Sequence, residues 1–144
     1  MRTWLTATGL AALVAATLVG TASAAPPRTP AQVARAWSRA LNAGDDKAAG
    51  ALFARNAVIV QGGLAIRLPD AKIATLWNSG LPCAGTIVRL RVQGRVATAT
   101  FRLGHRKGHT CDGPGELAAA KFTVVKGKIV RWEQVAPDEG GPKA

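Results

Sequence analysis

The sequence predicts an α+β domain, with helices in the first half of the chain and long β-strands in the second. Three segments, at 29–44, 45–56 and 69–80, combine helix start signals with apolar residues at helical spacing. Beyond Pro82, four runs instead interleave apolar and polar residues, as strands with one buried face do. A run of strands joined by tight turns favours a mostly antiparallel sheet.

The first helix has the clearest start signal. Thr29 is the expected N-cap, Pro30 occupies the first helical position and Gln32 completes a capping box. Gly44 follows the helix as its expected end. Its buried stripe is expected to consist of three residues spaced by four: Val33, Trp37 and Leu41.

Two further helices and two short strands follow. Asp45 or Asp46 can cap a helix over 47–56, and Pro69-Asp70 starts another over 71–80. Short strands are expected at 57–61 and 64–68. The expected apolar faces are Ala48, Leu52 and Phe53 in the second helix, and Ile73, Leu76 and Trp77 in the third.

The first 24 residues have the three-part layout of a secretory signal peptide. A basic start at Arg2 precedes an apolar run from about Leu10 to Val19, and Ala22-Ser23-Ala24 offers a cleavage site. An uncleaved anchor is the alternative, but the apolar run is short and interrupted. We expect a secreted or periplasmic product, cleaved near Ala24 and without a membrane span. Its domain would cover 25–137, followed by a disordered tail over 138–144.

The chain is strongly basic. It carries 19 Lys and Arg against 8 Asp and Glu, and loss of Arg2 with the signal peptide would change the net charge from +11 to +10. This charge favours contact with an anionic surface such as phospholipid or cell-wall polymer. Nucleic acid is disfavoured as a partner, because the basic residues form no block of five and the chain has no Tyr to stack on bases.

Cys83 and Cys111 are the only cysteines, and export to an oxidising compartment predicts a disulfide between them. If 86–92 and 95–103 form a hairpin around Gln93-Gly94, residue 83 lies opposite about residue 104, close to the loop that carries Cys111. The hairpin therefore brings the two cysteines within plausible reach.

The loop around Cys111 also suggests a metal site, since His105, His109 and Asp112 lie near it in sequence. However, the histidines stand on a Gly-rich loop, where nothing fixes a shared direction, and Cys111 is expected in the disulfide. We therefore expect no metal and no other cofactor.

Two stretches carry a family resemblance. The first, AWSRALNAGDDKAAGALFARNAVIV, contains a helix, a Gly-Asp break, a second helix and a strand; the second, KFTVVKGKIVRWEQV, forms a closing hairpin. On these stretches, which cover most of 30–136, the chain resembles the nuclear transport factor 2-like superfamily, which includes ketosteroid isomerase and SnoaL-like polyketide cyclases. The resemblance implies a cone-shaped fold in which three N-terminal helices pack on a curved, mostly antiparallel sheet, often around a pocket. Members include enzymes and non-catalytic domains, so the fold does not decide function.

The last hairpin, 117–125 with 128–135, supplies the candidate catalytic residues. If Val125 faces Lys128 across the turn, strict alternation places Arg131 and Glu133 on the more apolar face with Phe122, pointing into the cone. Glu133 could then act as a general base with Arg131 as its electrostatic partner. The alternative is a structural ion pair at the sheet margin.

The aromatic residues suggest both a pocket and an interface. Trp37, Phe53, Trp77, Phe101 and Phe122 are the expected pocket or core residues. Strict alternation places Trp132 and Lys121 on the opposite face, where they could form a homodimer interface through the sheet.

Two functions stay open at this stage. The first is a secreted, non-catalytic domain that binds a small apolar ligand or a protein partner. The second is an isomerase, dehydratase or cyclase that uses Glu133 as its base. The resemblance implies that a ketosteroid isomerase would carry its catalytic acid on the first strand after the second helix. Here that strand, 57–61, holds no acid and the chain has no Tyr to donate to an oxyanion, so this chemistry is disfavoured.

Overall fold

A computed structural model describes residues 19–137 of the chain. The predicted signal peptide lies outside these residues up to residue 18, and the predicted tail at 138–144 lies outside them entirely. None of the helices within 19–137 is long and apolar enough to cross a membrane. The elements, in chain order, are α1 (Pro30–Asn42), α2 (Asp46–Ala51), β1 (Phe53–Gln61), β2 (Leu64–Leu68), α3 (Ala71–Ser79), β3 (Cys83–Gln93), β4 (Val96–His105), β5 (Leu117–Val125) and β6 (Lys128–Val135).

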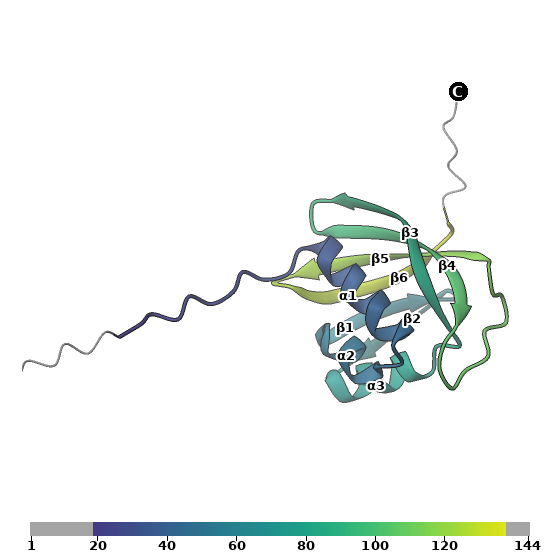
Figure 1. Ribbon diagram of the computed structural model, residues 1–144, viewed down its shortest axis with the longest axis horizontal. Coiled ribbons are helices and arrows are strands. Elements are labelled where there is room, and N and C mark those ends of the chain that lie inside the picture. The colour runs from purple at the N-terminus through teal and green to yellow at the C-terminus, as the bar shows by residue number, and fades with distance from the viewer. Residues whose placement is uncertain (1–18, 138–144) are drawn as a thin grey trace, which may run out of the picture.

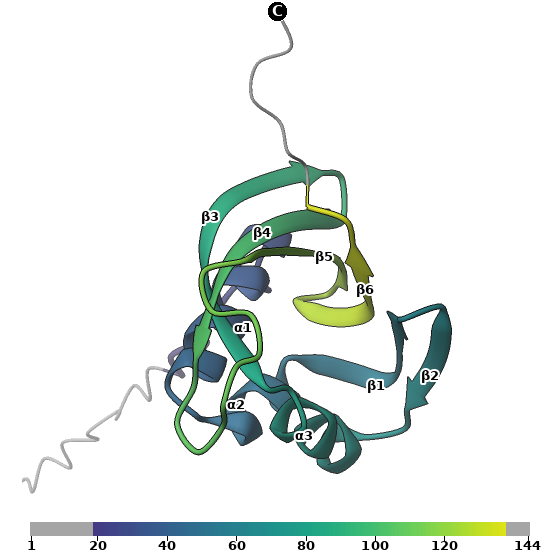
Figure 2. The ribbon, with the colours of Figure 1, turned by 90° about the vertical axis from the view of Figure 1, so that its right-hand side faces the viewer.

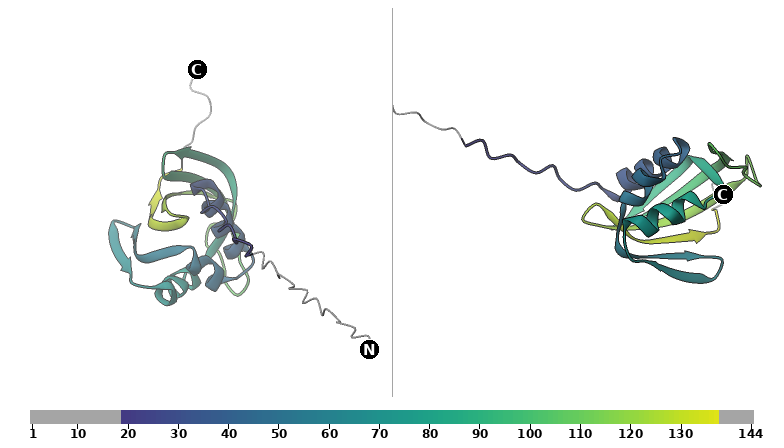
Figure 3. Two further views of the ribbon diagram at one scale, coloured as in Figure 1. Left: turned by 90° about the vertical axis from the view of Figure 1, so that its left-hand side faces the viewer. Right: turned by 90° about the horizontal axis from the view of Figure 1, so that it is seen from below.

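The strands form one curved sheet whose concave side holds the helices (Figures 1 and 2). The strand order is β2-β1-β6-β5-β4-β3, and only the β1–β6 pair is parallel. Helix α1 packs on β3, β4 and β5, whereas α3 packs on α2 and on the β1–β2 end. Figure 3 shows the helices from two further sides. The α+β architecture, the curved sheet and the order of elements predicted from the sequence are therefore confirmed.

Helix α1 begins as its sequence predicts. The Thr29 side chain accepts a hydrogen bond from the Gln32 amide (3.2 Å), and the Gln32 side chain accepts one from the Thr29 amide (2.9 Å). Gly44 follows with a φ of 70°, in the left-handed region that glycine adopts without strain. The expected stripe of Val33, Trp37 and Leu41 is buried.

The second helix is shorter than expected. Asp45 caps it by accepting a hydrogen bond from the Ala48 amide (2.9 Å), but the helix ends at Ala51, and the strand β1 already begins at Phe53. Leu52 and Phe53 are buried as expected, whereas Ala48 is exposed. The continuation of the helix to residue 56 was therefore wrong.

The buried face of α3 also differs from the expectation. Ala74 and Asn78 are fully buried, while Ile73 and Leu76 are exposed. The Asn78 side chain donates to the Ala74 carbonyl oxygen within α3 and accepts a hydrogen bond from Trp37 Nε1 of α1. These bonds satisfy its polar atoms, so a polar residue lies on the inner face where hydrophobicity alone favours Ile73 and Leu76. Trp77 is half-buried against the core, as expected.

The β3–β4 hairpin closes one residue later than predicted. Gln93 pairs with Val96, so the turn consists of Gly94 and Arg95, and a bulge near Val88 shifts the register further along. Cys83 consequently lies opposite His105 rather than residue 104. The predicted disulfide between Cys83 and Cys111 is present.

A bulge in β6 overturns the predicted faces of the last hairpin. Val125 pairs with Lys128 and Val124 with Ile129, as expected, but Thr123 then pairs with Arg131, which leaves Val130 as an extra residue in β6. One extra residue reverses the face of every later side chain. Arg131 and Glu133 therefore point away from the helices, and Trp132 points toward them.

Glycine at position 50 lets α2 and α3 approach closely. A Cβ atom at Gly50 would lie 2.5 Å from the Thr75 hydroxyl and 2.7 Å from its backbone nitrogen. Contacts this short require one helix to move, because the obstacle includes backbone.

We expect Gly50→Ala to lower the free energy of unfolding by about 1–3 kcal/mol, as overpacking of a closed core does. Urea unfolding followed by circular dichroism measures this. Gly104→Ala is the control, because a Cβ at Gly104 meets no atom within 4 Å. Equal stability of the two variants would show that the α2–α3 contact is not as close as described.

Candidate functional site

The aromatic side chains form one cluster on the concave side of the sheet. Trp132 lies at its centre, with ring centroids 5.0 Å from Trp77, 5.9 Å from Trp37 and 6.5 Å from Phe122. Phe101 extends the cluster beyond Trp37, at 5.8 Å. Most of these ring pairs are edge-to-face. Such pairs stabilise the fold beyond the contribution of the buried apolar surface.

A cavity of about 170 Å³ lies beside this cluster. Trp37 and Leu41 of α1 form one wall, Phe101 and Leu103 of β4 form another, and Trp132 of β6 a third. The remaining lining residues are the segment 81–85, the alanines 118–120, Gln61 and Gln134. An apolar cavity of about 150 Å³ accommodates a benzene-sized molecule, so this space suits a ligand of about one ring.

The cavity lining is neutral throughout. Among its lining residues, all within 19–137, none has an ionisable side chain, and Cys83 is held in the disulfide. The side chains with polar atoms are those of Gln61, Gln134 and the two tryptophans, Trp37 and Trp132. General acid–base catalysis needs a titratable group within hydrogen-bond reach of the reacting atom, and the lining supplies none.

Two glutamines mark one side of the cavity. Val60 of β1 lies in register with Glu133 of β6, so the next residues, Gln61 and Gln134, are neighbours at the ends of these strands. Gln134 is exposed and Gln61 half-buried, which places this side toward solvent. Leu64 is paired with Gln61 on the edge strand β2 and is 71% exposed. The exposed surface beside Gln61 and Gln134 therefore includes an apolar side chain, that of Leu64.

Trp132 has an indole N–H without a hydrogen-bond partner. The residue is 5% exposed, and its Nε1 is buried with no acceptor among the described residues. By contrast, the Nε1 of Trp37 donates to Asn78 Oδ1 over 2.8 Å. A buried donor left without an acceptor costs about 1–3 kcal/mol.

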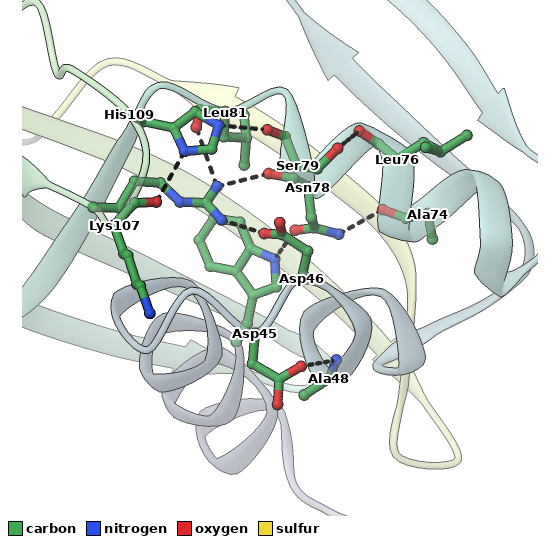
Figure 4. Close-up of polar contacts among 12 residues, drawn as sticks. Asp45, Asp46, Ala48, Ala74, Leu76, Asn78, Ser79, Leu81, Lys107 and His109 are labelled. Carbon is green, nitrogen blue, oxygen red and sulfur yellow. Dashed lines mark hydrogen bonds and ion pairs between the residues drawn. The ribbon is translucent and has the colours of Figure 1, made fainter.

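A buried polar network fixes the segment at the end of α3 (Figure 4). The Arg106 guanidinium donates to the carbonyl oxygens of Asn78 (2.8 Å) and Leu81 (3.1 Å) and pairs with Asp46. His109 Nε2 donates to the Ser79 carbonyl oxygen over 2.8 Å. These contacts attach the β4–β5 loop to α2 and α3, and so position Leu81 in the cavity wall.

Helix α1 is attached to β3 beside the cavity through the backbone of a glycine. The carbonyl oxygen of Gly85 accepts hydrogen bonds from Ser38 Oγ and from Asn42 Nδ2, both 2.8 Å. A Cβ at Gly85 would lie 2.9 Å from the Cβ of Phe101, so the site requires a residue without a side chain. This close approach lets Gly85 and Phe101 line the cavity together.

The structure places the predicted site residues in three different settings. Trp37 and Phe101 line the cavity, whereas Phe53, Trp77 and Phe122 pack into the aromatic cluster and are not among its lining residues. His105 and His109 contact backbone groups, Cys111 forms the disulfide, and no group of metal-binding side chains occurs within 19–137.

The inward position expected for Arg131 and Glu133 was wrong. Arg131 Nε lies 3.3 Å from Glu133 Oε2 on the outer face of the sheet, where the two side chains are 46% and 35% exposed. They line a polar groove there with Lys121 and with threonines of β4 and β5. The physical cause is the extra residue Val130, which strict alternation does not anticipate.

The proposed position of Trp132 at an outer dimer interface was also wrong. Its indole lies inside the cone, so it is not accessible to a second subunit through the sheet face. Lys121 remains on the outer face and is exposed. Trp132 therefore belongs to the cavity wall and not to an interface on the outer face.

We expect Arg106→Met to lower the free energy of unfolding by about 3 kcal/mol, near the low end for breaking a buried pair because Asp46 is partly exposed. Urea unfolding measures the loss. Arg102→Met is the matched control, since that guanidinium is exposed and donates one hydrogen bond, to Gly115. A loss below about 1 kcal/mol for Arg106→Met, or an equal loss for both variants, would contradict the anchoring role.

Comparison with known proteins identifies the fold. No family model matches the chain, and no curated protein sequence matches it. Among solved structures, an NTF2-like protein of unknown function from Cytophaga hutchinsonii has a TM-score of 0.61 and 12% identity, covering 74% of this chain and 88% of that one. A proposed polyketide cyclase from Sinorhizobium meliloti has a TM-score of 0.58 and 19% identity, covering 72% and 93%.

A third solved structure of similar fold contains a small ligand. This protein from Catenulispora acidiphila, with a ketosteroid isomerase-like fold and in complex with trimethylamine, has a TM-score of 0.58 and 19% identity, covering 80% of this chain and 100% of that one. At these identities the similarity establishes the fold and not the activity. The chain thus has the cone-shaped fold of the nuclear transport factor 2-like superfamily.

Proposed function

We propose that this chain, with its nuclear transport factor 2-like fold, is a non-catalytic binding domain for a small apolar ligand held in the cavity between α1 and the inner face of the sheet. The observation that carries the proposal is the neutral, mostly apolar lining beside an aromatic cluster. Ligand sites are usually apolar hollows with few polar groups, and this one has that composition. The complex of a protein of similar fold with trimethylamine supports a ligand of small size.

We propose further that the chain acts outside the cytoplasm. The signal-like N-terminus supports export, and so does the disulfide between Cys83 and Cys111, because such bonds persist in oxidising compartments. The first proposed partner of the exported protein is the small molecule in the cavity. An anionic surface stays a second partner, supported by the net charge alone.

An enzyme that uses Glu133 as a general base is the alternative. In that case the chemistry would take place in the polar groove on the outer face, which Arg131 and Lys121 also line. The Arg131–Glu133 pair is more than a third exposed on both sides, so it resembles an ordinary surface ion pair in its energetics. No second observation favours catalysis there.

The test uses toluene, a one-ring apolar probe, and thermal unfolding of the full chain. Binding to the folded state alone raises the unfolding midpoint with ligand concentration. Ala120 lines the cavity and is buried, so Ala120→Leu fills the space with three more carbon atoms. We expect toluene to raise the midpoint of the original chain, and to do so at least about tenfold less effectively in Ala120→Leu.

Two variants serve as controls. Ala65→Leu makes the same change at an exposed position of β2 and should leave the toluene effect unaltered. Glu133→Gln should also leave it unaltered. If toluene has no effect on the original chain, or acts equally on Ala120→Leu, the cavity is not the binding site. A response lost in Glu133→Gln and kept in Ala120→Leu would instead move the site to the outer groove.

A further inference from the structure

One hollow at the N-terminal end of α1 is lined by five cationic side chains and by no acidic one. The cations come from the residue before the helix cap, from the exposed face of α1, and from the turn between β5 and β6. These residues, which define the basic groove, are Arg28, Arg35, Arg39, Lys126 and Lys128. None of the five has a carboxylate partner within 19–137. A concave surface with one sign of charge concentrates ions of the opposite sign.

Backbone packing holds the segments of the basic groove together. The chain enters α1 beside the β5–β6 turn (Figure 1). A Cβ atom at Gly127 would lie 3.0 Å from the Arg28 amide nitrogen and 3.3 Å from Pro27 Cβ, so the glycine in the turn allows this close contact. Lys128 Nζ donates to the Ala51 carbonyl oxygen over 2.5 Å. The fold itself therefore brings these positive charges near one another.

The charges of the basic groove repel one another. Arg35 and Arg39 are both exposed and stand four residues apart on α1, a spacing at which like charges destabilise a helix. Helix α1 contains no acid that would offset them. A bound anion would remove this repulsion, so the arrangement favours an anionic ligand.

A second hollow continues the basic groove past Arg35 and Arg39. Both arginines line it, together with Asn42 of α1 and Thr86 of β3. The two hollows have volumes of about 770 and 630 Å³, each several times the 170 Å³ of the inner cavity. A single small ion would fill little of this space, whereas a chain with repeated charges can contact both hollows.

We propose that the basic groove binds a linear anionic polysaccharide, whose carboxylate or sulfate groups contact the five cations and whose chain continues between α1 and β3. Arginine guanidinium groups form paired hydrogen bonds with carboxylates. The side chains of Asn42 and Thr86, both exposed, are neutral and polar and can contact the sugar hydroxyl groups. The inference rests on the part of the proposed function that assigns an anionic partner, and it does not depend on the cavity ligand.

Two other classes of anionic partner fit the lining less well. Single-stranded nucleic acid binds by stacking its bases on aromatic side chains, and no aromatic residue lines either hollow. A phospholipid surface takes up large apolar side chains as well as cations. None of the exposed large hydrophobic residues within 19–137 lines either hollow. A polysaccharide requires neither feature.

The test is isothermal titration calorimetry of the full chain with a heparin decasaccharide, which is a linear anionic polysaccharide, at about 0.05 and 0.15 M salt. We expect binding at the lower salt concentration and weaker binding at the higher one, because a polyanion releases counterions when it binds. A heparin disaccharide should bind at least about tenfold more weakly, since it reaches fewer of the cations.

Two double variants separate the basic groove from the net charge. Arg35→Gln with Arg39→Gln removes two charges from the groove and should weaken decasaccharide binding at least about tenfold at the lower salt concentration. Its dependence on salt should also become less steep. Arg67→Gln with Lys72→Gln removes the same charge from exposed positions of β2 and α3, outside both hollows, and should weaken binding by less than about threefold. All four positions are exposed, so both variants should fold.

Equal losses in the two double variants would overturn the inference, because they would assign binding to the net charge. Equal affinities for the disaccharide and the decasaccharide would overturn it in favour of a single ion site. Tighter binding of single-stranded DNA or of vesicles with anionic phospholipid would overturn the polysaccharide assignment. No binding of the decasaccharide at the lower salt concentration would also remove the anionic partner from the proposed function. The toluene titration tests the cavity ligand separately, so the two failures are distinguishable.

Discussion

The β-bulge at Val130 is the constraint on which the inside of this protein depends. Before the bulge, β5 and β6 pair as simple alternation requires, with Val124 opposite Ile129. After it, Phe122 lies opposite Trp132, and both rings enter the core. One inserted residue therefore exchanges an ion pair for an indole on the inner face. The aromatic cluster, the neutral cavity and the external position of Glu133 all follow from this exchange.

The walls of the cavity are held in place by polar contacts rather than by the sheet alone. Arg106 connects the β4–β5 loop to the carbonyl groups at the end of α3, and Gly85 receives two hydrogen bonds from α1 (Figure 4 shows the contacts around Asp46 and Asn78). The Cys83–Cys111 disulfide joins the same loop to the start of β3. Packing, hydrogen bonds and a covalent link together position the wall segments 81–85 and α1.

Much of the fold could be predicted from local patterns, because capping boxes, helix ends and tight turns depend on neighbouring residues. The capping box at Thr29 and the turn at Gly127 belong to this class. The disulfide joins residues 28 apart, and it could be predicted because the chain has only two cysteines and the expected hairpin brings them close. The candidate site could not be predicted, since it depends on a bulge that leaves no local sequence signal and on contacts between distant residues. Arg106 illustrates this: its partners lie 25, 28 and 60 residues away, and in the sequence it is one basic residue in a Gly-rich loop.

The proposed function requires that the neutral cavity beside Trp132 binds a small molecule. A crystal structure of the full chain soaked with toluene tests it most directly. We expect density for one ring in the cavity between Trp37, Phe101 and Trp132. A cavity closed by side chains, or density for the probe only on the outer face near Glu133, would contradict it.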